Sequence, residues 1–350
     1  MGKLLRHIQL VIVAGLICYG CAYAQDVKKD AVAENMLIYQ RNVGGWPKAV
    51  NEVPVNYNKT LTDEQRQAVA AGANGIDATI DNNATFKEIT YLVKAYKQTN
   101  NPAYLQSAEK GIKYLLKAQN KQGGWPQYFP DARLYRAQIT FNDNAMINTL
   151  NVLFDVAHGL NNFEVVDKTL VPQADAAVQK GVTCIIKTQI RRDGVPTGWC
   201  QQYDQNTLKP AMARKFELVG NSSSETVGIV LFLMRIDKPS EEVKTAVAKA
   251  VEWLNNVKIV GYKFEHFADP SQANGKGARL VADPTSTIWS RYYDIDTDKP
   301  FFSGRNSEKV YDVQQIENER RTGYAWYGTW PQKLIDKAYP QWAKKNGLAN

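Results

Sequence analysis

Cysteine is scarce in this 350-residue chain, which contains four, two of them within the first 24 positions. The other two, Cys184 and Cys200, allow at most one disulfide, and the sequence alone does not say whether they pair. This scarcity excludes a small scaffold held together by disulfides, and it excludes a cysteine-rich zinc site.

Histidine and long apolar segments are scarce as well. After position 24 only His158 and His266 remain, so chemistry that needs a histidine base or a histidine-bound metal has few candidates. No apolar run beyond the N-terminal segment is long enough to cross a membrane. We therefore expect an exported protein with no stable membrane span.

The first 24 residues have the pattern of a secretory signal peptide. Lys3 and Arg6 precede an apolar run from Leu10 to Ile17, and the small-residue site Ala22-Tyr23-Ala24 follows. Lipid attachment at Cys21 is the less favoured alternative, because the tyrosine two positions before it suits that modification badly. We expect cleavage after Ala24 and a periplasmic or secreted protein.

The charge balance indicates an acidic partner. Without Lys3 and Arg6 the formal net charge falls from +8 to +6. For an exported protein a positive charge favours an anionic polysaccharide over nucleic acid. The remaining 326 residues (350 minus 24) are enough for one large domain, and we predict a single domain over residues 25–350, acting as a monomer.

An internal repeat is the main indication of the fold. Residues 108–127 and 178–201 share a Lys-Gly pair, an aliphatic doublet, Lys-x-Gln and then Gly and Trp, and residues 37–48 repeat the end of this pattern. The repeat recurs about every 70 to 80 residues, which suits a pair of helices with connections. Apolar residues recur at helical spacing within 86–96, 105–115, 146–157 and 225–236.

These repeats predict a mainly all-α fold, an α/α toroid in which inner helices are ringed by outer ones. The part from Val257 onward is rich in Tyr, Asp, Pro and Gly, so we expect extended loops there with short strands at most. Trp46 and Trp125 follow paired glycines, and we favour packing over the turn to sugar binding. The aromatic segment 324–330 is expected to close the ring by packing.

Two acids precede predicted helices. Asp81-Asn82 and Asp143-Asn144 take what look like equivalent places in their repeats. One interpretation is helix capping, in which an Asp or Asn oxygen accepts the free N–H groups of the first turn. The other is one shared site for a hard cation, because helix ends of one polarity line one mouth of a toroid. We take the shared site as the working hypothesis.

Arginines supply the opposite charge. Arg214 and Lys215 lie in a loop before the third predicted inner helix, and Arg291 and Arg305 lie on a polar segment. A lone surface arginine is usually only a solvated charge, but its planar fork matches a carboxylate in a two-bond geometry. If these loops cross the mouth that holds Asp81 and Asp143, the groove suits a chain of uronates.

The motifs together resemble the pectate lyases of polysaccharide lyase family 10. They follow one another over nearly all of residues 25–350: QRNVGGWPK, TIDNNATFKEITYLVKAY, GGWPQYFP, ITFNDNAM, WCQQYDQNTLKPAMARKFEL, FEHFADP, WSRYYDIDTDKPFFSGR and ENERRTGYAWYGTWP. One departure is VGNSSSET after Arg214, where a more glycine-rich segment is expected.

The resemblance implies an α/α toroid that cleaves α-1,4-linked polygalacturonate by calcium-dependent β-elimination and releases 4,5-unsaturated oligogalacturonates. It also implies roles for seven residues: Asp81 and Asp143 as calcium ligands, Arg214 as catalytic base, Arg291 and Arg305 as uronate binders, and Asn82 and Lys48 as weaker candidates for substrate binding.

The chemistry gives these roles a physical reason. Removing the C5 proton of a galacturonate leaves a carbanion beside a carboxylate, and a cation on that carboxylate draws off the developing charge. An arginine base is unusual because its pKa normally keeps it charged. Neighbouring cations and alkaline conditions would both raise the neutral fraction, so we expect activity at high pH.

Two other functions stay open at this point. A non-catalytic protein could use the same arginines to bind acidic polysaccharide. An inverting glycoside hydrolase needs two carboxyl groups about 6.5 to 9.5 Å apart, which Asp81 and Asp143 could imitate. Unsaturated product and a calcium requirement distinguish the lyase from both.

Overall fold

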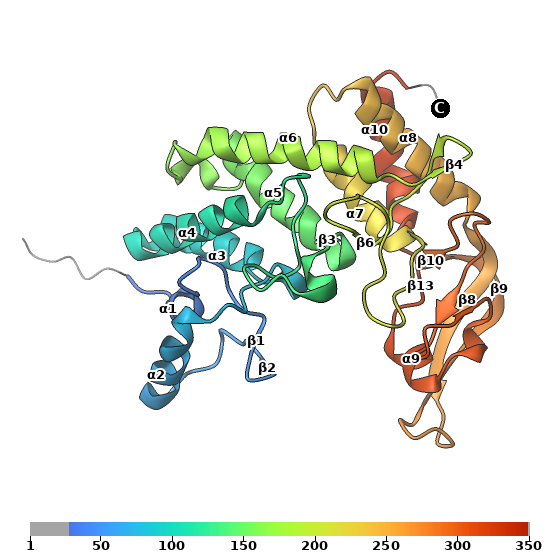
Figure 1. Cartoon of the computed structure of the whole chain (residues 1–350), viewed down its shortest axis with the longest axis horizontal. Coiled ribbons are helices and arrows are strands. Elements are labelled where there is room, and N and C mark those ends of the chain that lie inside the picture. Colours follow the sequence, from blue (N-terminus) through green and yellow to red (C-terminus); the bar gives the residue numbers. More distant parts are fainter. Residues whose placement is uncertain (1–27, 349–350) are drawn as a thin grey trace, which may run out of the picture.

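The computed structural model describes residues 28–348 (Figure 1). The predicted signal peptide and Cys21 lie outside this range. Among the described residues, the helices are all too short or too polar to cross a membrane. Cys184 and Cys200 are both buried free thiols, and burial raises the pKa of the Cys184 thiol to about 12.

Three helix pairs form two layers. Helices α3, α5 and α7 contact one another in order in one layer, α4, α6 and α8 do so in the other, and the two helices of each pair (α3–α4, α5–α6 and α7–α8) pack against each other. The bounds are α1 Ala31–Tyr39, α2 Asp63–Ala71, α3 Phe86–Thr99, α4 Pro102–Ala118, α5 Ala145–His158, α6 Leu170–Thr188, α7 Ser223–Leu233, α8 Glu241–Asn256, α9 Asn318–Gly323 and α10 Tyr339–Lys345.

Helix α4 shows how the sequence sets these elements. Asn101 caps its first turn by accepting a hydrogen bond from the Ala103 N–H at 3.1 Å, and Pro102 stands where its missing N–H costs nothing. Its buried residues recur every three or four positions and face the main core: Tyr104, Ala108, Ile112 and Leu115. This periodicity buries one face of the helix between the two layers.

The prediction of an all-α fold with short strands at most is wrong. Strands β8 (Ile259–Ala268) and β9 (Lys276–Ser290), of 10 and 15 residues, form a long antiparallel hairpin, and β13 (Tyr327–Gly328) pairs with the far end of β9. The other strands have two residues each: β1 Ala49–Val50, β2 Val53–Pro54, β3 Ile139–Thr140, β4 Arg191–Arg192, β5 Val195–Pro196, β6 Gln202–Tyr203, β7 Asn221–Ser222, β10 Tyr292–Tyr293, β11 Phe302–Ser303 and β12 Lys309–Val310.

A bulge explains why sequence analysis did not predict the hairpin. Between the pairs Val260–Thr287 and Tyr262–Ala282 lie one residue on β8, Gly261, and four on β9, residues 283–286. The stretch contains Pro284, which cannot donate to a strand ladder, and Gly261 has a φ of +84°. The bulge takes up both residues, so a sequence that resembles a loop continues as a strand on either side.

The predicted closed ring is wrong as well. The helix pairs are stacked in chain order, with α1 and α2 at one end of the molecule and α8 and α10 at the other (Figure 1). The hairpin extends from the α8 end. The aromatic segment near residue 326 packs there, in a second core cluster, rather than closing a ring: Tyr292, Phe301, Phe302, Val313, Ile316 and Trp326.

Four tryptophans mark the repeat in space. Each is buried, and each donates its indole N–H to a carbonyl of the preceding helix: Trp46 to Met36, Trp125 to Leu115, Trp199 to Ile185 and Trp289 to Leu254, at 2.7 to 2.8 Å. The packing interpretation of Trp46 and Trp125 is therefore confirmed. The hairpin β8–β9 occupies the connection between α8 and the fourth tryptophan.

Candidate active site

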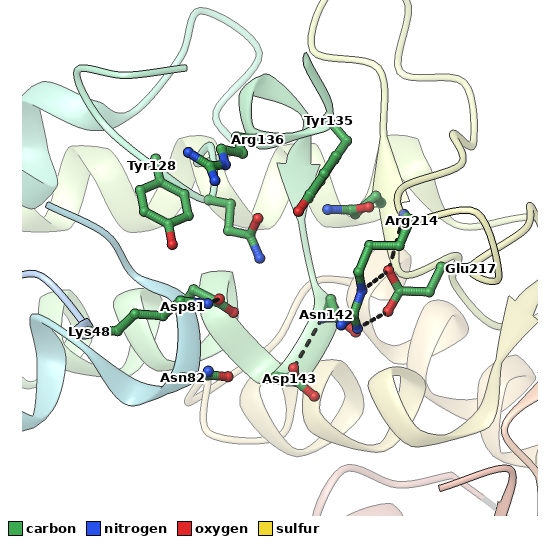
Figure 2. Close-up of a pocket in the computed structure, with 12 residues that line it drawn as sticks. Lys48, Asp81, Asn82, Tyr128, Tyr135, Arg136, Asn142, Asp143, Arg214 and Glu217 are labelled. Carbon is green, nitrogen blue, oxygen red and sulfur yellow. Dashed lines mark hydrogen bonds and ion pairs between the residues drawn. The ribbon is translucent and has the colours of Figure 1, made fainter. Parts of the chain in front are cut away.

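A polar pocket lies where the chain enters α3 and α5 (Figure 2). Five of the residues predicted from sequence line it: Lys48, Asp81, Asn82, Asp143 and Arg214. The other residues lining the pocket are Gln127, Tyr128, Tyr135, Arg136, Asn142, Gln202 and Glu217. Segments that are far apart in sequence thus bring acids and cations to one place.

Asp81 and Asp143 lie in two short turns, Asp81–Asn83 and Asn142–Asn144, with unusual backbone conformation. In both turns the second and third residues have positive φ: Asn82 (+48°), Asn83 (+67°), Asp143 (+51°) and Asn144 (+58°). Asn and Asp adopt this left-handed conformation more readily than other residues with a side chain. The runs of Asp and Asn at these positions therefore have a local conformational reason.

The two turns correspond with an offset of one residue from the predicted alignment. The N–H groups of Thr79 and Thr140 donate to the carbonyls of Trp46 and Trp125, which fixes these threonines as equivalent. Counting from them, Asp143 matches Asn82 and not Asp81. The first two positions of each turn thus hold one acid and one amide, but in opposite order.

The capping interpretation is also wrong. The N-cap of α3 is Thr85 and that of α5 is Asn144, and neither makes a side-chain capping bond. Asp81 and Asp143 point instead toward the pocket (Figure 2).

Asp81 is buried and paired with Lys48. It is 4% exposed, its backbone N–H donates to the Thr79 hydroxyl at 3.0 Å, and its carboxylate forms an ion pair with Lys48 Nζ. Burial opposes the charge of Lys48, but the hydrogen bond and the charge of Asp81 raise the Lys48 pKa above its usual value. Lys48 is therefore held as a cation beside Asp81 in the pocket lining.

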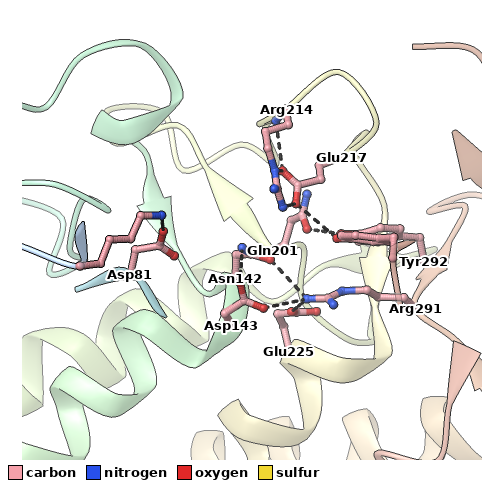
Figure 3. A network of polar contacts seen from close by, with 11 residues as sticks. Asp81, Asn142, Asp143, Gln201, Arg214, Glu217, Glu225, Arg291 and Tyr292 are labelled. Atoms are coloured by element: carbon pink, nitrogen blue, oxygen red, sulfur yellow. Dashed lines mark hydrogen bonds and ion pairs between the residues drawn. The ribbon is translucent and has the colours of Figure 1, made fainter. Parts of the chain in front are cut away.

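Asp143 has a half-exposed side chain and a different partner. Nη2 of the buried Arg291 lies 3.4 Å from Asp143 Oδ1 and 3.3 Å from Asn142 Oδ1, and it also pairs with the buried Glu225 (Figure 3). Burial raises the pKa of Asp143, the Arg291 charge lowers it, and the neighbouring acids Glu225 and Asp81 raise it further. The net direction is upward, and its largest cause is the loss of hydration on burial.

Arg214 lies on the opposite side of the pocket, bound to Glu217. Its Nε is 2.7 Å from Glu217 Oε2, its Nη2 pairs with Oε1, and Glu217 also accepts a hydrogen bond from the Tyr324 hydroxyl at 3.2 Å. The hydrogen bond to Glu217 raises the pKa of Arg214 further above its usual range, although burial opposes this. The expectation of neighbouring cations that favour neutral Arg214 is therefore wrong, because its closest charged partner is a carboxylate.

The structure separates the remaining predicted residues. Arg291 is buried and does not line the pocket itself, but it contacts the lining residues Asn142 and Asp143. Arg305 is exposed, pairs with Glu319 at 2.9 Å and is not among the residues lining the pocket. Lys215 is exposed beside Arg214.

Sequence reasoning missed Glu217 and Glu225, and it missed a repeat that would have helped. WCQQYDQNTLKP (199–210) and WSRYYDIDTDKP (289–300) are two copies of one motif. In both, the tyrosine hydroxyl accepts a backbone N–H three residues earlier: Tyr203 from Cys200 at 2.6 Å and Tyr293 from Ser290 at 2.8 Å. This alignment places Arg291 at the position of Gln201.

The oxygen atoms at the pocket suit a hard cation, though they are few. Within residues 28–348 no three His, Cys, Asp or Glu side chains gather as a metal site. A calcium ion here would take the carboxylates of Asp81 and Asp143, with amide oxygens of Asn82 or Asn142 nearby, and would need further ligands from water or substrate. A cation here would offset the repulsion between Asp143 and the neighbouring acids Asp81 and Glu225.

Comparison with known proteins decides the family. The family model described as pectic acid lyase matches residues 40–335. The chain belongs to the pectic acid lyase family. It is a polysaccharide lyase, as the motifs suggested.

Two solved structures resemble this pectic acid lyase over almost their whole length. The family 10 polysaccharide lyase from Cellvibrio cellulosa has 34% sequence identity and a TM-score of 0.78, and the alignment covers 91% of this chain and 92% of that one. An aspartate-to-alanine mutant of the same lyase, in complex with trigalacturonic acid, matches with the same values. No curated protein sequence matches the chain significantly.

Proposed function

We propose that this polysaccharide lyase cleaves polygalacturonate by calcium-dependent β-elimination and leaves 4,5-unsaturated oligogalacturonates. One observation carries the proposal: Asp81, Asp143 and Arg214, from three distant segments, line the same pocket. The trigalacturonic acid bound by the similar Cellvibrio lyase supports the choice of substrate. The predicted signal peptide would bring the enzyme to polymer outside the cytoplasm.

Asp81 and Asp143 are the proposed calcium ligands. When bound, calcium would draw charge from the substrate carboxylate and so acidify the C5 proton. In the structure, the positive charges of Lys48 and Arg291 balance the negative charges of Asp81 and Asp143. Lys48 would remain beside Asp81 as a cation near the substrate, and Arg291 would turn Asp143 toward the pocket.

Arg214 is the proposed base. Glu217 occupies its Nε and Nη2, while Nη1 makes no hydrogen bond to any described residue and is the nitrogen we assign to the C5 proton. Because Glu217 holds the pKa of Arg214 above its usual range, the neutral form is rare and grows as the pH rises. The rate should therefore increase with pH across the alkaline range.

Arg291 stays a proposed uronate ligand through its Nη1, which makes no hydrogen bond to the described residues. Arg305 is less suited to this role, because its guanidinium is engaged by Glu319 outside the pocket.

The experiment that tests this function follows ultraviolet absorbance of the unsaturated product on polygalacturonate, with calcium and with a chelator. We expect absorbance that grows with calcium and stops with the chelator. New reducing ends without absorbance would indicate a hydrolase, and binding without any cleavage would indicate a carbohydrate-binding protein.

A further inference from the structure

One wall of the pocket carries a cation that the proposed mechanism does not use. Tyr128, Tyr135 and Arg136 belong to the segment that rises above Asp81 and Lys48 (Figure 2). The guanidinium carbon of Arg136 lies 4.6 Å from the centre of the Tyr128 ring, and Lys48 Nζ lies 5.9 Å from the same ring. Stacking on an aromatic face holds a guanidinium in place and leaves its edge free to donate.

The backbone fixes Arg136 relative to Asp81. The Arg136 carbonyl accepts a hydrogen bond from the Gln127 N–H at 2.9 Å. The Gln127 carbonyl in turn accepts from the Ile80 N–H at 3.1 Å and from the Thr79 hydroxyl at 2.5 Å. Arg136 is thus connected through Gln127 to the residues directly before Asp81.

The charge of Arg136 is still available. Its guanidinium makes no hydrogen bond to any described residue, and its closest acid is Asp131, at 3.6 Å from Nη1. Asp131 already accepts two hydrogen bonds from Arg133, from Nε and Nη2. Arg133 therefore satisfies the acid of this loop, and Arg136 lines the pocket with unused donors.

We infer that Arg136, stacked on Tyr128, binds the carboxylate of a second uronate, adjacent along the polymer to the one that reacts. The inference rests on the proposed function for the choice of polymer. It adds a specificity element: neighbouring sugars that carry a free carboxylate should bind better than methyl-esterified ones, since an ester offers no charge to the arginine fork.

The test compares Arg136→Ala with Arg133→Ala, a matched change on the same loop. Calorimetry measures the binding of tetragalacturonate and of its fully methyl-esterified form, and thermal unfolding checks that the variants are folded. Loss of a two-bond charged contact predicts that Arg136→Ala weakens binding of the acid form by about tenfold. The ester should bind this variant and the parent equally, and Arg136→Lys should recover part of the loss.

Two results would overturn the inference. One is an Arg136→Ala variant that binds the acid form as well as the parent does. The other is an equal loss for acid and ester, which would indicate a structural role. Because binding needs no turnover, a parent that binds but never produces absorbance would refute the proposed function and leave this test intact.

Discussion

The two turns that carry the acids share a backbone and differ in chemistry. In the turn Asp81–Asn83 the acid comes first, is buried and pairs with a lysine. In the turn Asn142–Asn144 the acid comes second, is half-exposed and pairs with an arginine that also binds Glu225. A repeated backbone therefore does not give repeated electrostatics, because a one-residue change in the order of acid and amide gives each carboxylate different charged partners.

The proposed function assigns both turns to one cation and proton transfer to a third segment, which holds Arg214, so the largest effect is expected there. Arg214→Lys keeps the charge but changes reach and geometry, and turnover at saturating substrate should fall at least about a hundredfold, as expected on losing a general base. Binding of oligogalacturonate should stay within a few-fold of the parent. Steady-state kinetics and calorimetry measure the two quantities.

Lys215→Ala is the control, because Lys215 is exposed beside Arg214. It should behave as the parent does. If Arg214→Lys kept its turnover and only bound substrate more weakly, Arg214 would be a carboxylate ligand and not the base.

The next effect tests whether both turns serve one cation. Asp81→Asn and Asp143→Asn each keep an oxygen but remove a charge, so each should raise the calcium concentration needed for half-maximal rate by about tenfold or more. Calcium titrations of the absorbance assay give this value. If one variant kept normal calcium dependence, its turn would not belong to the calcium site, and the assignment of both turns to one cation would be wrong.

The smallest effect concerns folding stability without calcium. Replacing the acid of one turn should lower this stability, and replacing the acid of the other should not. Asp81→Asn leaves Lys48 without its partner and should lower the free energy of unfolding at neutral pH by about 1 to 3 kcal/mol. The raised pKa of Lys48 means that this contribution is present below the ordinary lysine value and is lost as pH rises through the folded value.

Asp143→Asn should unfold at the same temperature as the parent or a higher one at neutral pH. Because the pKa of Asp143 is raised in the folded state, its protonated carboxyl contributes folding stability below the ordinary Asp pKa. This contribution is lost as the pH rises, so ionised Asp143 opposes folding near neutrality. Thermal unfolding measured over a range of pH should show that the stability gained by Asp143→Asn vanishes below about pH 4. Equal losses in both variants would show that the two turns do not differ electrostatically.

Sequence analysis reached the helix pairs, and it named five of the residues that line the pocket. Asp81, Asn82, Asp143 and Arg214 could be noticed from their side-chain types and their place before predicted helices, whereas Lys48 came only from the family resemblance. It did not predict the hairpin β8–β9, because Gly261 and Pro284 suggest a loop. Only the structure shows that both residues lie in a bulge within the hairpin. Nor did it reach Glu217 and Glu225, whose importance arises from contacts with Arg214 and Arg291 that only tertiary packing creates.

The four indole bonds have a consequence for the order in which the chain folds. Three of them close loops of 10, 10 and 14 residues, whereas the fourth closes a loop of 35 because the hairpin lies between α8 and Trp289. Loop-closure entropy grows with the logarithm of loop length, so the fourth closure costs about 1 kcal/mol more than the first two. The three early repeats are therefore expected to form from nearby contacts, while the last, which carries Arg291, assembles after them and completes the surroundings of Asp143 at a late stage.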